Sequence, residues 1–279
     1  APVCEELFAE IDKDTVDFID NYDGTMKEPT LLPTRFPNIL VSSNIGIAVG
    51  IASQICGFNL NEVCETTIKC LFDPEHDILS TLTAPDFPTG GDLIYSRDEL
   101  AEIYLSGRGS FKVRAKWRLS AESSSIIEIF QIPYTTSTDI ISDKVAELVK
   151  QGKIKEINDI RDETDLGGLK IAIDMKRGTD ADKLMQKLYR YTTLEESFSC
   201  NFNILIGGFP RLMGIREIIT EWIAWRCECV RRRVYRECQD KKAKLHLLKG
   251  LEKVLLDIDK AINIIRETEY ENEVIPNLM

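Results

Sequence analysis

The sequence has few of the residues from which hydrolytic and metal-dependent active sites are built. Only two histidines, His76 and His246, occur in 279 residues, and neither has Cys or carboxylate neighbours at metal-ligand spacing. The eight cysteines form no CxxC pair, and most of them lie in apolar segments, as small hydrophobic residues do. A zinc site or a His-based triad is therefore hard to build, and we expect reduced thiols and a cytoplasmic location.

Long apolar runs and nucleotide-binding loops are missing as well. No run of eighteen apolar residues occurs, and the start at Ala1 lacks the basic and apolar regions of a signal peptide, so we expect neither a membrane span nor a secretion signal. There is no GxxxxGK(S/T) loop for ATP and no convincing acidic cluster for Mg²⁺, so we expect no cofactor on this chain. A net charge of -11 argues against general affinity for a polyanion, and any contact with nucleic acid must be local.

Apolar spacing and turn residues predict the elements of the first hundred residues. We expect a helix over 4–19, an extended connector over 29–37 that contains three prolines, and a strand-and-turn element over 38–52. Asn59 followed by Glu62 predicts the start of a helix that runs to Phe72. Shorter helices are expected over 77–82 and 97–105, the second ending at Gly107.

The middle of the chain predicts a mixed unit of strands and helices. Residues 110–118 alternate between an apolar and a basic face, which is typical of a half-buried strand. The following segments are expected as strand 126–132, helix 137–150, strand 154–160, strand 169–175, helix 180–190 and strand 202–206. This βαββαβ order is typical of a ferredoxin-like unit, and the fold class is therefore α+β.

The last part of the chain predicts one long helix. Residues 214–268 contain no Pro and, apart from Gly250, no Gly after the first position. The apolar residues of its later half are spaced three and four apart, which is the seam of a coiled coil: Leu248, Leu251, Leu255, Ile258, Ile262 and Ile265. Such a seam needs a partner helix, which this sequence does not offer.

Several consecutive blocks of the sequence resemble the A subunit of bacterial type IIA topoisomerases, DNA gyrase and topoisomerase IV. The resemblance spans nearly the whole chain in order. It is carried by the blocks DTVDF (14–18), DNYDG (20–24), LPTRFPN (32–38), GIAVG (46–50), PDFPT (85–89), GRG (107–109), IPY (132–134), RDET (161–164) and VRRR (230–233). The sequence departs from the commonest family pattern at ICGFN (55–59), where many members have Pro-Pro-His before the Asn, so any role of that turn is in doubt.

The resemblance implies a domain order and an activity. Residues 1–28 would be a helix and connector from a winged-helix domain, 29–213 a tower domain, and 214–279 the first helix of a coiled coil that leads to an exit gate. The attacking tyrosine would lie in an Arg-Tyr-Thr motif about half a dozen residues before Ala1, so no catalytic residue is assigned and the isolated chain is expected to be inactive. The whole protein would take part in ATP-dependent double-strand passage, which changes DNA supercoiling or linkage.

The resemblance also implies partners. Double-stranded DNA would be the substrate, a B subunit would bring Mg²⁺ and ATP, and two copies of each subunit would form an A2B2 complex. Two other classes of protein stay open from the residues alone. One is a non-enzymatic DNA-binding or assembly scaffold that reuses the tower. The other is a two-metal nuclease, for which the acidic group around Asp159 to Asp165 reads better as a polar turn.

Ile47 is the first candidate for DNA contact. In the family the matching isoleucine is pushed between base pairs as an apolar wedge, and Gly46 before it would let the backbone approach the duplex closely. The sequence pattern alone favours a different interpretation, a buried isoleucine within a strand. Only the resemblance implies the wedge.

Basic residues form the second group of candidates. Arg35 matches a family position that faces DNA, although a solvated surface arginine fits as well. The cations of 107–118 have no acidic residue among them and would present a positive stripe to phosphates: Arg108, Lys112, Arg114, Lys116 and Arg118. An exposed strand can also be basic merely to prevent edge pairing. For Arg231, Arg232 and Arg233, with Arg226 and Arg236, ion pairing within the protein is the better interpretation.

Overall fold

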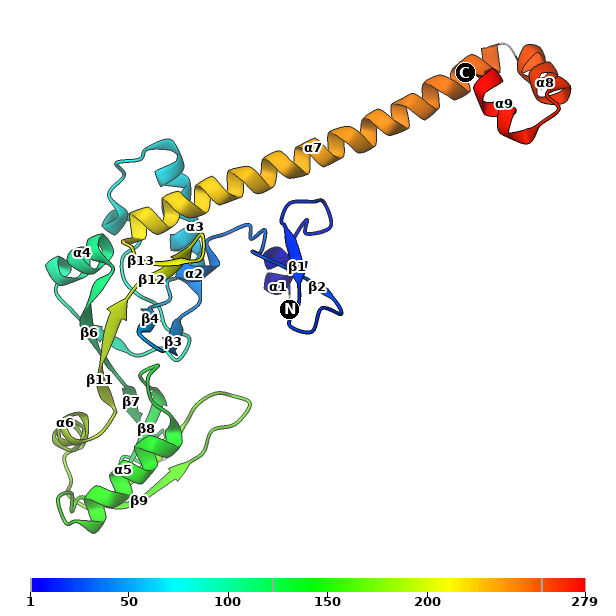
Figure 1. Cartoon of the computed structure of the whole chain (residues 1–279). Helices are drawn as coiled ribbons and strands as arrows, with labels where there is room; N and C mark the ends of the chain where they lie inside the picture. The colour runs from blue at the N-terminus through cyan, green and yellow to red at the C-terminus, as the bar shows by residue number, and fades with distance from the viewer. Residues whose placement is uncertain (1, 122, 257, 279) are drawn as a thin grey trace. The chain divides into compact units, whose positions relative to one another are not determined.

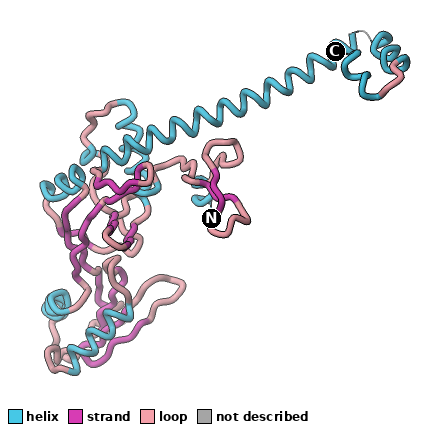
Figure 2. Tube along the Cα trace, in the orientation of Figure 1, coloured by secondary structure: helices cyan, strands magenta, loops and turns pink. Residues whose placement is uncertain are grey.

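A computed structural model describes residues 2–121, 123–256 and 258–278, with the path of the chain shown in Figures 1 and 2. The chain forms two compact units, one made of residues 1–35 with 225–279 and the other of residues 36–224. The predicted segments 1–28 and most of 214–279 thus belong to the same unit, and the terminal residues of both lie outside the described residues. All named strand pairs are antiparallel and accompany separate helices, which agrees with the α+β class.

The first unit begins with a short helix instead of the predicted helix over 4–19. Helix α1 (Pro2–Leu7) is followed by Glu10 and Asp14, whose φ angles of 69° and 55° lie in the left-handed region that an α-helix cannot contain. The prediction was wrong because Glu10 serves as a tertiary ion-pair acceptor, which apolar spacing does not reveal. Strands β1 (Phe18–Asp20) and β2 (Lys27–Pro29) then form a small hairpin.

The second unit contains a five-stranded antiparallel sheet in the order β3-β4-β11-β6-β5. Its strands are β3 (Asn44–Ala48), β4 (Ile51–Ile55), β5 (Asp92–Ile94), β6 (Arg108–Arg114) and β11 (Glu195–Asn201). One face of this sheet is buried, since Phe111 and Val113 of β6 and Phe198 and Cys200 of β11 are at most 4% exposed. The residues between them on each strand point to the opposite face, which we call the outer face.

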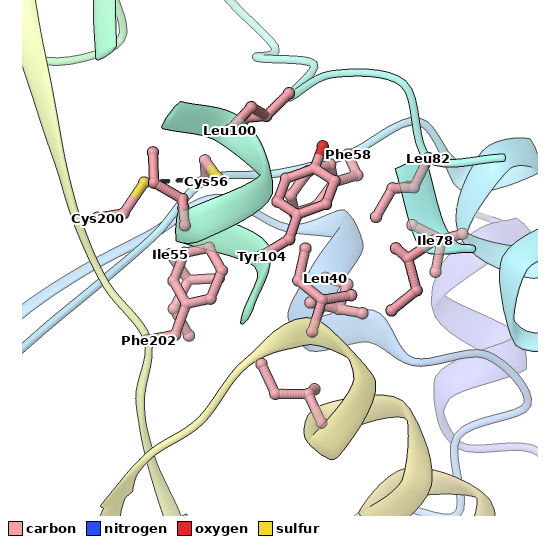
Figure 3. Close-up of a cluster of buried hydrophobic side chains, with 14 of the residues drawn as sticks. Leu40, Ile55, Cys56, Phe58, Ile78, Leu82, Leu100, Tyr104, Cys200 and Phe202 are labelled. Atoms are coloured by element: carbon pink, nitrogen blue, oxygen red, sulfur yellow. Dashed lines mark hydrogen bonds between the residues drawn. The ribbon is translucent and has the colours of Figure 1, made fainter. Parts of the chain in front are cut away.

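The buried face packs against helices around a cluster of buried hydrophobic side chains, part of which is shown in Figure 3. The helices are α2 (Asn38–Val41), α3 (Leu60–Phe72), the 3-10 turn η1 (Ile78–Ser80), α4 (Arg97–Ser106) and the start of α7. The prediction for α3 and its cap is confirmed, because the Asn59 side chain accepts a hydrogen bond from the backbone of Asn61. Helix α4 carries a capping box at Ser96 and ends at Gly107, whose φ is 72°.

A second sheet of four strands lies in the same unit, in the order β7-β8-β10-β9. Its strands are β7 (Lys116–Leu119), β8 (Ile126–Gln131), β9 (Ile157–Asp162) and β10 (Ile171–Met175). Helices α5 (Thr138–Lys150) and α6 (Ala181–Tyr191) share one buried cluster with Ile127, Ile129, Ile171 and Ile173, so both helices pack on the same face. The opposite face of this sheet carries charged side chains such as Glu128 and Arg161.

Two predictions of how strands are placed in this region were wrong, although strand 202–206 itself is observed as β12. Residues 202–206 do not complete the four-stranded sheet: β12 (Asn203–Ile206) pairs instead with β13 (Phe209–Leu212), and β7 occupies the edge next to β8. The predicted strand 110–118 is divided at Ala115, with β6 in one sheet and β7 in the other. Alternation of apolar and polar residues identifies which side chains face a core, but it does not say which core. Phe111 and Val113 face the core of the five-stranded sheet, whereas Ala115 and Trp117 face the core of the four-stranded sheet.

The predicted long helix is observed as two described helices. Helix α7 (Ile215–Leu256) is followed by α8 (Ile258–Glu267), and residue 257 between them lies outside the described residues. A further helix, α9 (Glu271–Leu278), contains Pro276. The side chains of the predicted seam are all more than a third exposed: Leu248, Leu251, Leu255, Ile258, Ile262 and Ile265.

Candidate nucleic-acid interface

The β3–β4 hairpin carries Ile47 close to its tip. The two strands are in register from Asn44 opposite Ile55 to Ala48 opposite Ile51, which leaves Val49 and Gly50 as a two-residue turn. Gly50 has a φ of 81°, a value that side-chain-bearing residues rarely adopt. Short β-branched residues favour the extended strands, and the glycine allows the chain to reverse.

The tip of the hairpin is apolar and exposed. The Ile47 side chain is 85% exposed and Val49 is fully exposed, while Ile45 and Ile51 are each about two-fifths exposed. No charged residue occurs between 44 and 55. The interpretation of Ile47 as a buried strand residue is therefore wrong, because β3 is the edge strand of the sheet and its tip extends beyond the core. Burying one such side chain against a partner is worth about 1.5–3 kcal/mol.

The base of the hairpin is closely packed. The Ser43 hydroxyl accepts a hydrogen bond from the backbone of Gly57 at 3.0 Å, and a Cβ at Gly57 would lie only 2.7 Å from the same oxygen. The Tyr134 hydroxyl donates to the Ser43 carbonyl at 3.4 Å. Residues 55–58 of the segment that departs from the family pattern are buried here, and Cys56 faces Cys200 with 3.9 Å between the sulfurs (Figure 3). The hairpin thus has a rigid base and an exposed tip.

The predicted basic stripe is divided between the two sheets and is largely neutralised within the protein. Arg108, Lys112 and Arg114 lie on the outer face of β6, while Lys116 and Arg118 belong to β7. Ion pairs join Lys112 and Arg114 to Glu195, Lys116 to Asp92, and Arg118 to Glu128. Within the described part of the chain, Arg108 is the member of the stripe that has no carboxylate partner within 4.0 Å.

Glu195 forms ion pairs with both cations at the C-terminal end of β6, Lys112 and Arg114. Burial alone would raise its pKa, but hydrogen bonds from Lys112 and Arg114 outweigh that effect, and the pKa lies below its ordinary value. Arg114 also stacks on the Tyr189 ring with its guanidinium carbon 4.7 Å from the ring centre. These contacts commit both cations to the protein and reduce their attraction for an external phosphate.

Arg35 lies in the other unit and is committed in the same way. Its guanidinium contacts Glu6 and Glu10 at 3.0 and 3.1 Å. Glu10 also accepts hydrogen bonds from Arg226 and Arg233; burial would raise its pKa, but these arginines together lower it. Arg232 and Arg236 contact Asp17 and Asp14. The prediction that the α7 arginines pair with carboxylates is confirmed.

Gly46, the remaining candidate, is in the middle of β3 and pairs with Ser53. A Cβ at this position would meet only the Asn44 side chain, at 4.0 Å. The protein itself thus does not require a glycine there. A close approach of DNA to this glycine stays a prediction.

Asn201 is a polar residue of this region that the sequence did not single out. Its side-chain amide donates a hydrogen bond to the Ala52 carbonyl of β4 at 2.6 Å. In the sheet, Asn201 is paired with Gln54 of β4 on one side and with Arg108 of β6 on the other. The side-chain oxygen of Asn201 is buried and has no partner among the described residues. Sequence pattern gives no signal for such a residue, because its role depends on sheet register between segments about 150 positions apart.

Among residues 2–121, 123–256 and 258–278, no group of three or more His, Cys, Asp or Glu side chains is arranged to hold a metal ion. None of the helices in the same ranges is both long and apolar enough to cross a membrane.

Comparisons with known proteins match the whole chain to one family. The family of the DNA gyrase/topoisomerase IV A subunit matches residues 1–279. The DNA gyrase A subunit of Borrelia hermsii is 39% identical over 271 residues, which are 95% of this chain and 33% of that protein. The DNA gyrase A subunit of Metamycoplasma arthritidis is 39% identical over 94% of this chain and 30% of that protein. The chloroplastic/mitochondrial DNA gyrase A subunit of Nicotiana benthamiana is 37% identical over 94% and 29%, respectively. The chain thus spans about a third of the length of these curated relatives.

Proposed function

This chain belongs to the family of the A subunits of DNA gyrase and topoisomerase IV, and from that premise we propose that it supports and bends the duplex that such an enzyme cleaves. The single observation that carries the proposal is the exposed, uncharged tip of the β3–β4 hairpin. An isoleucine that is 85% exposed on a rigid base has no packing role among the described residues.

The wedge mechanism follows from the chemistry of the tip. An apolar side chain inserted between base pairs unstacks one step at a cost of a few kcal/mol, which is offset by contacts that the bent duplex makes with the protein. Ile47 supplies the branched apolar group, and Val49 extends the apolar surface beyond it. Because residues 44–55 contain no charged side chain, no charged group of the hairpin needs to be desolvated when the tip enters the duplex.

The other parts of the proposal rest on the family. We assign residues 36–224 to the tower, with the four-stranded sheet and helices α5 and α6 as its ferredoxin-like part. Helix α7 is the first helix of the coiled coil, which its exposed apolar seam supports. The complete protein would carry the attacking tyrosine, and a partner B subunit would supply ATP hydrolysis and Mg²⁺ in an A2B2 complex that passes one duplex through another. This chain by itself would then be inactive.

The test is a bending measurement on the complete protein in complex with its B partner. Fluorescence energy transfer between the ends of a short duplex reports the bent fraction. Ile47→Ala should lower the bent-to-straight ratio about tenfold, which corresponds to about 1.4 kcal/mol, while changing duplex affinity much less. Leu166→Ala is the matched control, because Leu166 is an even more exposed apolar residue at the tip of the β9–β10 hairpin. Unchanged bending in the Ile47 variant would contradict the wedge and favour a non-enzymatic scaffold.

A further inference from the structure

The outer face of the five-stranded sheet aligns the hairpin with Arg108. Ile45 is paired with Gln54, Gln54 with Asn201, and Asn201 with Arg108. Directly paired residues of antiparallel strands share a face, so these four residues form one row across four strands. Ile47 is two positions along β3 from this row and therefore points to the same face. We call Ile45, Gln54, Asn201 and Arg108 the cross-strand row.

The dimensions of the cross-strand row match those of a duplex at the wedge. Three strand spacings of about 4.8 Å put Arg108 about 14 Å from β3. Apolar wedges enter the duplex from the minor groove, which is only about 6 Å wide, so an arginine at that distance would lie outside this groove. At about 3.4 Å per nucleotide, this distance corresponds to roughly four steps along one strand of a duplex that follows the row.

The cations further along β6 are differently placed. At about 3.3 Å per residue, Lys112 and Arg114 are about 13 and 20 Å further along the strand than Arg108. Both are held by Glu195. Between them and Arg108 the outer face carries neutral, exposed residues, Ser110 and Ser199. Among the described residues, the outer face thus has one uncommitted cation level with the hairpin and a neutralised pair at its far end.

We propose that Arg108 contacts the DNA backbone beside the wedge and sets where Ile47 enters the duplex, with Asn201 as the positioning residue that fixes the spacing between them. The proposal rests on the proposed bending function and deepens it. It replaces the five-residue basic stripe by a single phosphate contact. Lys112 and Arg114 instead serve the protein, as their pairing with Glu195 indicates.

Asn201 can hold the outer part of the hairpin because the ladder between β4 and β11 is short. Strand β4 meets β11 at one paired position, Gln54 with Asn201, whereas β11 and β6 are paired over seven. The Asn201 side chain adds a second link, to the Ala52 carbonyl, which is opposite Ile47 on the hairpin. Loss of that bond would loosen the outer part of the hairpin, which carries Ile47, without removing any group that is proposed to touch DNA.

The first experiment measures duplex affinity against salt for the complete protein with its B partner. Arg108→Ala should lower the slope of log affinity against log salt concentration by about 0.9, the value for one phosphate contact. Lys112→Ala removes the same charge from the same face of the same strand and should change the slope by less than half as much. An equal or larger change for Lys112→Ala, or an unchanged slope for Arg108→Ala, would overturn the proposal.

The second experiment tests Asn201 by the bending measurement. Asn201→Leu, which has a similar shape but no donor, should reduce bending several-fold and leave the salt slope unchanged, while Asn201→Gln should retain more of the bending. In the Ile47→Ala background, Asn201→Leu should cause no further loss, because a positioning residue acts through the group that it positions. Additive losses, or equal bending by both Asn201 variants, would reject this role.

The two levels of the proposal fail separately. If Ile47→Ala leaves bending intact, the wedge function itself is wrong. If Ile47→Ala abolishes bending but Arg108→Ala and Lys112→Ala behave alike, only the assignment of Arg108 is wrong. Thermal melting of each variant establishes that it is folded before either conclusion is drawn.

Discussion

Two hairpins of residues 36–224, β3–β4 and β9–β10, expose apolar tips in opposite settings. The β3–β4 hairpin has no charged residue, and its tip presents Ile47 and Val49 to solvent. The β9–β10 hairpin ends in the fully exposed Leu166 but is lined by ion pairs, in which Arg161 contacts Asp174 and Glu163.

The difference shows how each hairpin holds its shape. Side chains of the β9–β10 hairpin pair with one another, so that hairpin satisfies its own polar groups. The β3–β4 hairpin depends on its base and on Asn201, and its tip has nothing to contact within residues 36–56 except its own apolar neighbours. An exposed apolar tip without internal partners is the feature that points outward to a ligand.

The largest effect should come from the core beneath each hairpin. Phe198→Ala removes a ring that stacks on Phe111 and packs at a tilt against Phe87 under the five-stranded sheet, and it should cost about 3–5 kcal/mol. Ile171→Ala, a fully buried change in β10, should cost about 2–5 kcal/mol.

Hydrogen exchange separates the two cores. The Phe198 variant should lose protection mainly in β4, β6 and β11, and the Ile171 variant mainly in β8, β9 and β10. Uniform loss across both sheets in either variant would show that the hairpins share one cooperative core, and the comparison would then fail.

The next effect concerns the backbone at each tip. Gly50 has a φ of 81° and Gly168 a φ of 131°, and a Cβ added at either position meets nothing within 4 Å. Alanine at these positions therefore tests backbone strain alone, at about 1–3 kcal/mol. Gly168→Ala should lower the exchange protection of its hairpin more, because 131° is further from the left-handed region that L residues tolerate. The reverse order would indicate that the β3–β4 turn is the stiffer of the two.

The smallest effect is the response to acid. Hydrogen bonds from Arg118, and then from Ser120 and Lys170, hold the pKa of Glu128 at about 2, far below its ordinary value of 4.5. Since the folded-state pKa is depressed, the stabilisation is complete above about pH 4.5 and is lost as the pH falls toward about 2.

Melting curves across that range give the measurement. The four-stranded sheet should lose stability with acid, and Glu128→Gln should be less stable at neutral pH but less sensitive to acid. The β3–β4 hairpin contains no titratable group between 44 and 55, so its own protection should not follow this titration. Equal acid sensitivity of wild type and Glu128→Gln would show that other carboxylates dominate.

Local signals predicted much of the fold. The cap at Asn59, the glycine that ends α4 and the helix and strand order from β8 to α6 follow from residue spacing, because each depends on neighbours within a few positions. The predictions failed where a distant contact decides the structure. Glu10 leaves the helical pattern to meet Arg226 and Arg233, and Ala115 divides one alternating run between two sheets.

For the candidate site as well, the sequence did not reveal what distant contacts decide. Ile47 was found through resemblance and not through its pattern, which indicated a buried residue. The stripe around Lys112 looked uniformly positive because Glu195, its partner, is 83 positions away. Asn201 could not be found at all, since sheet register alone places it beside Ala52 and Arg108.

The absence of charge in the β3–β4 hairpin has a consequence for the timing of DNA binding. An uncharged tip exerts no attraction beyond contact distance, so Ile47 should leave the association rate unchanged and act on how long a bent duplex survives. Arg108, whose field extends about a Debye length, roughly 8 Å at physiological salt, should instead influence arrival. If the proposed function holds, two residues on one face of a single sheet control different rates. Arg108 affects how fast the duplex binds, and Ile47 determines how long the bent duplex stays bound.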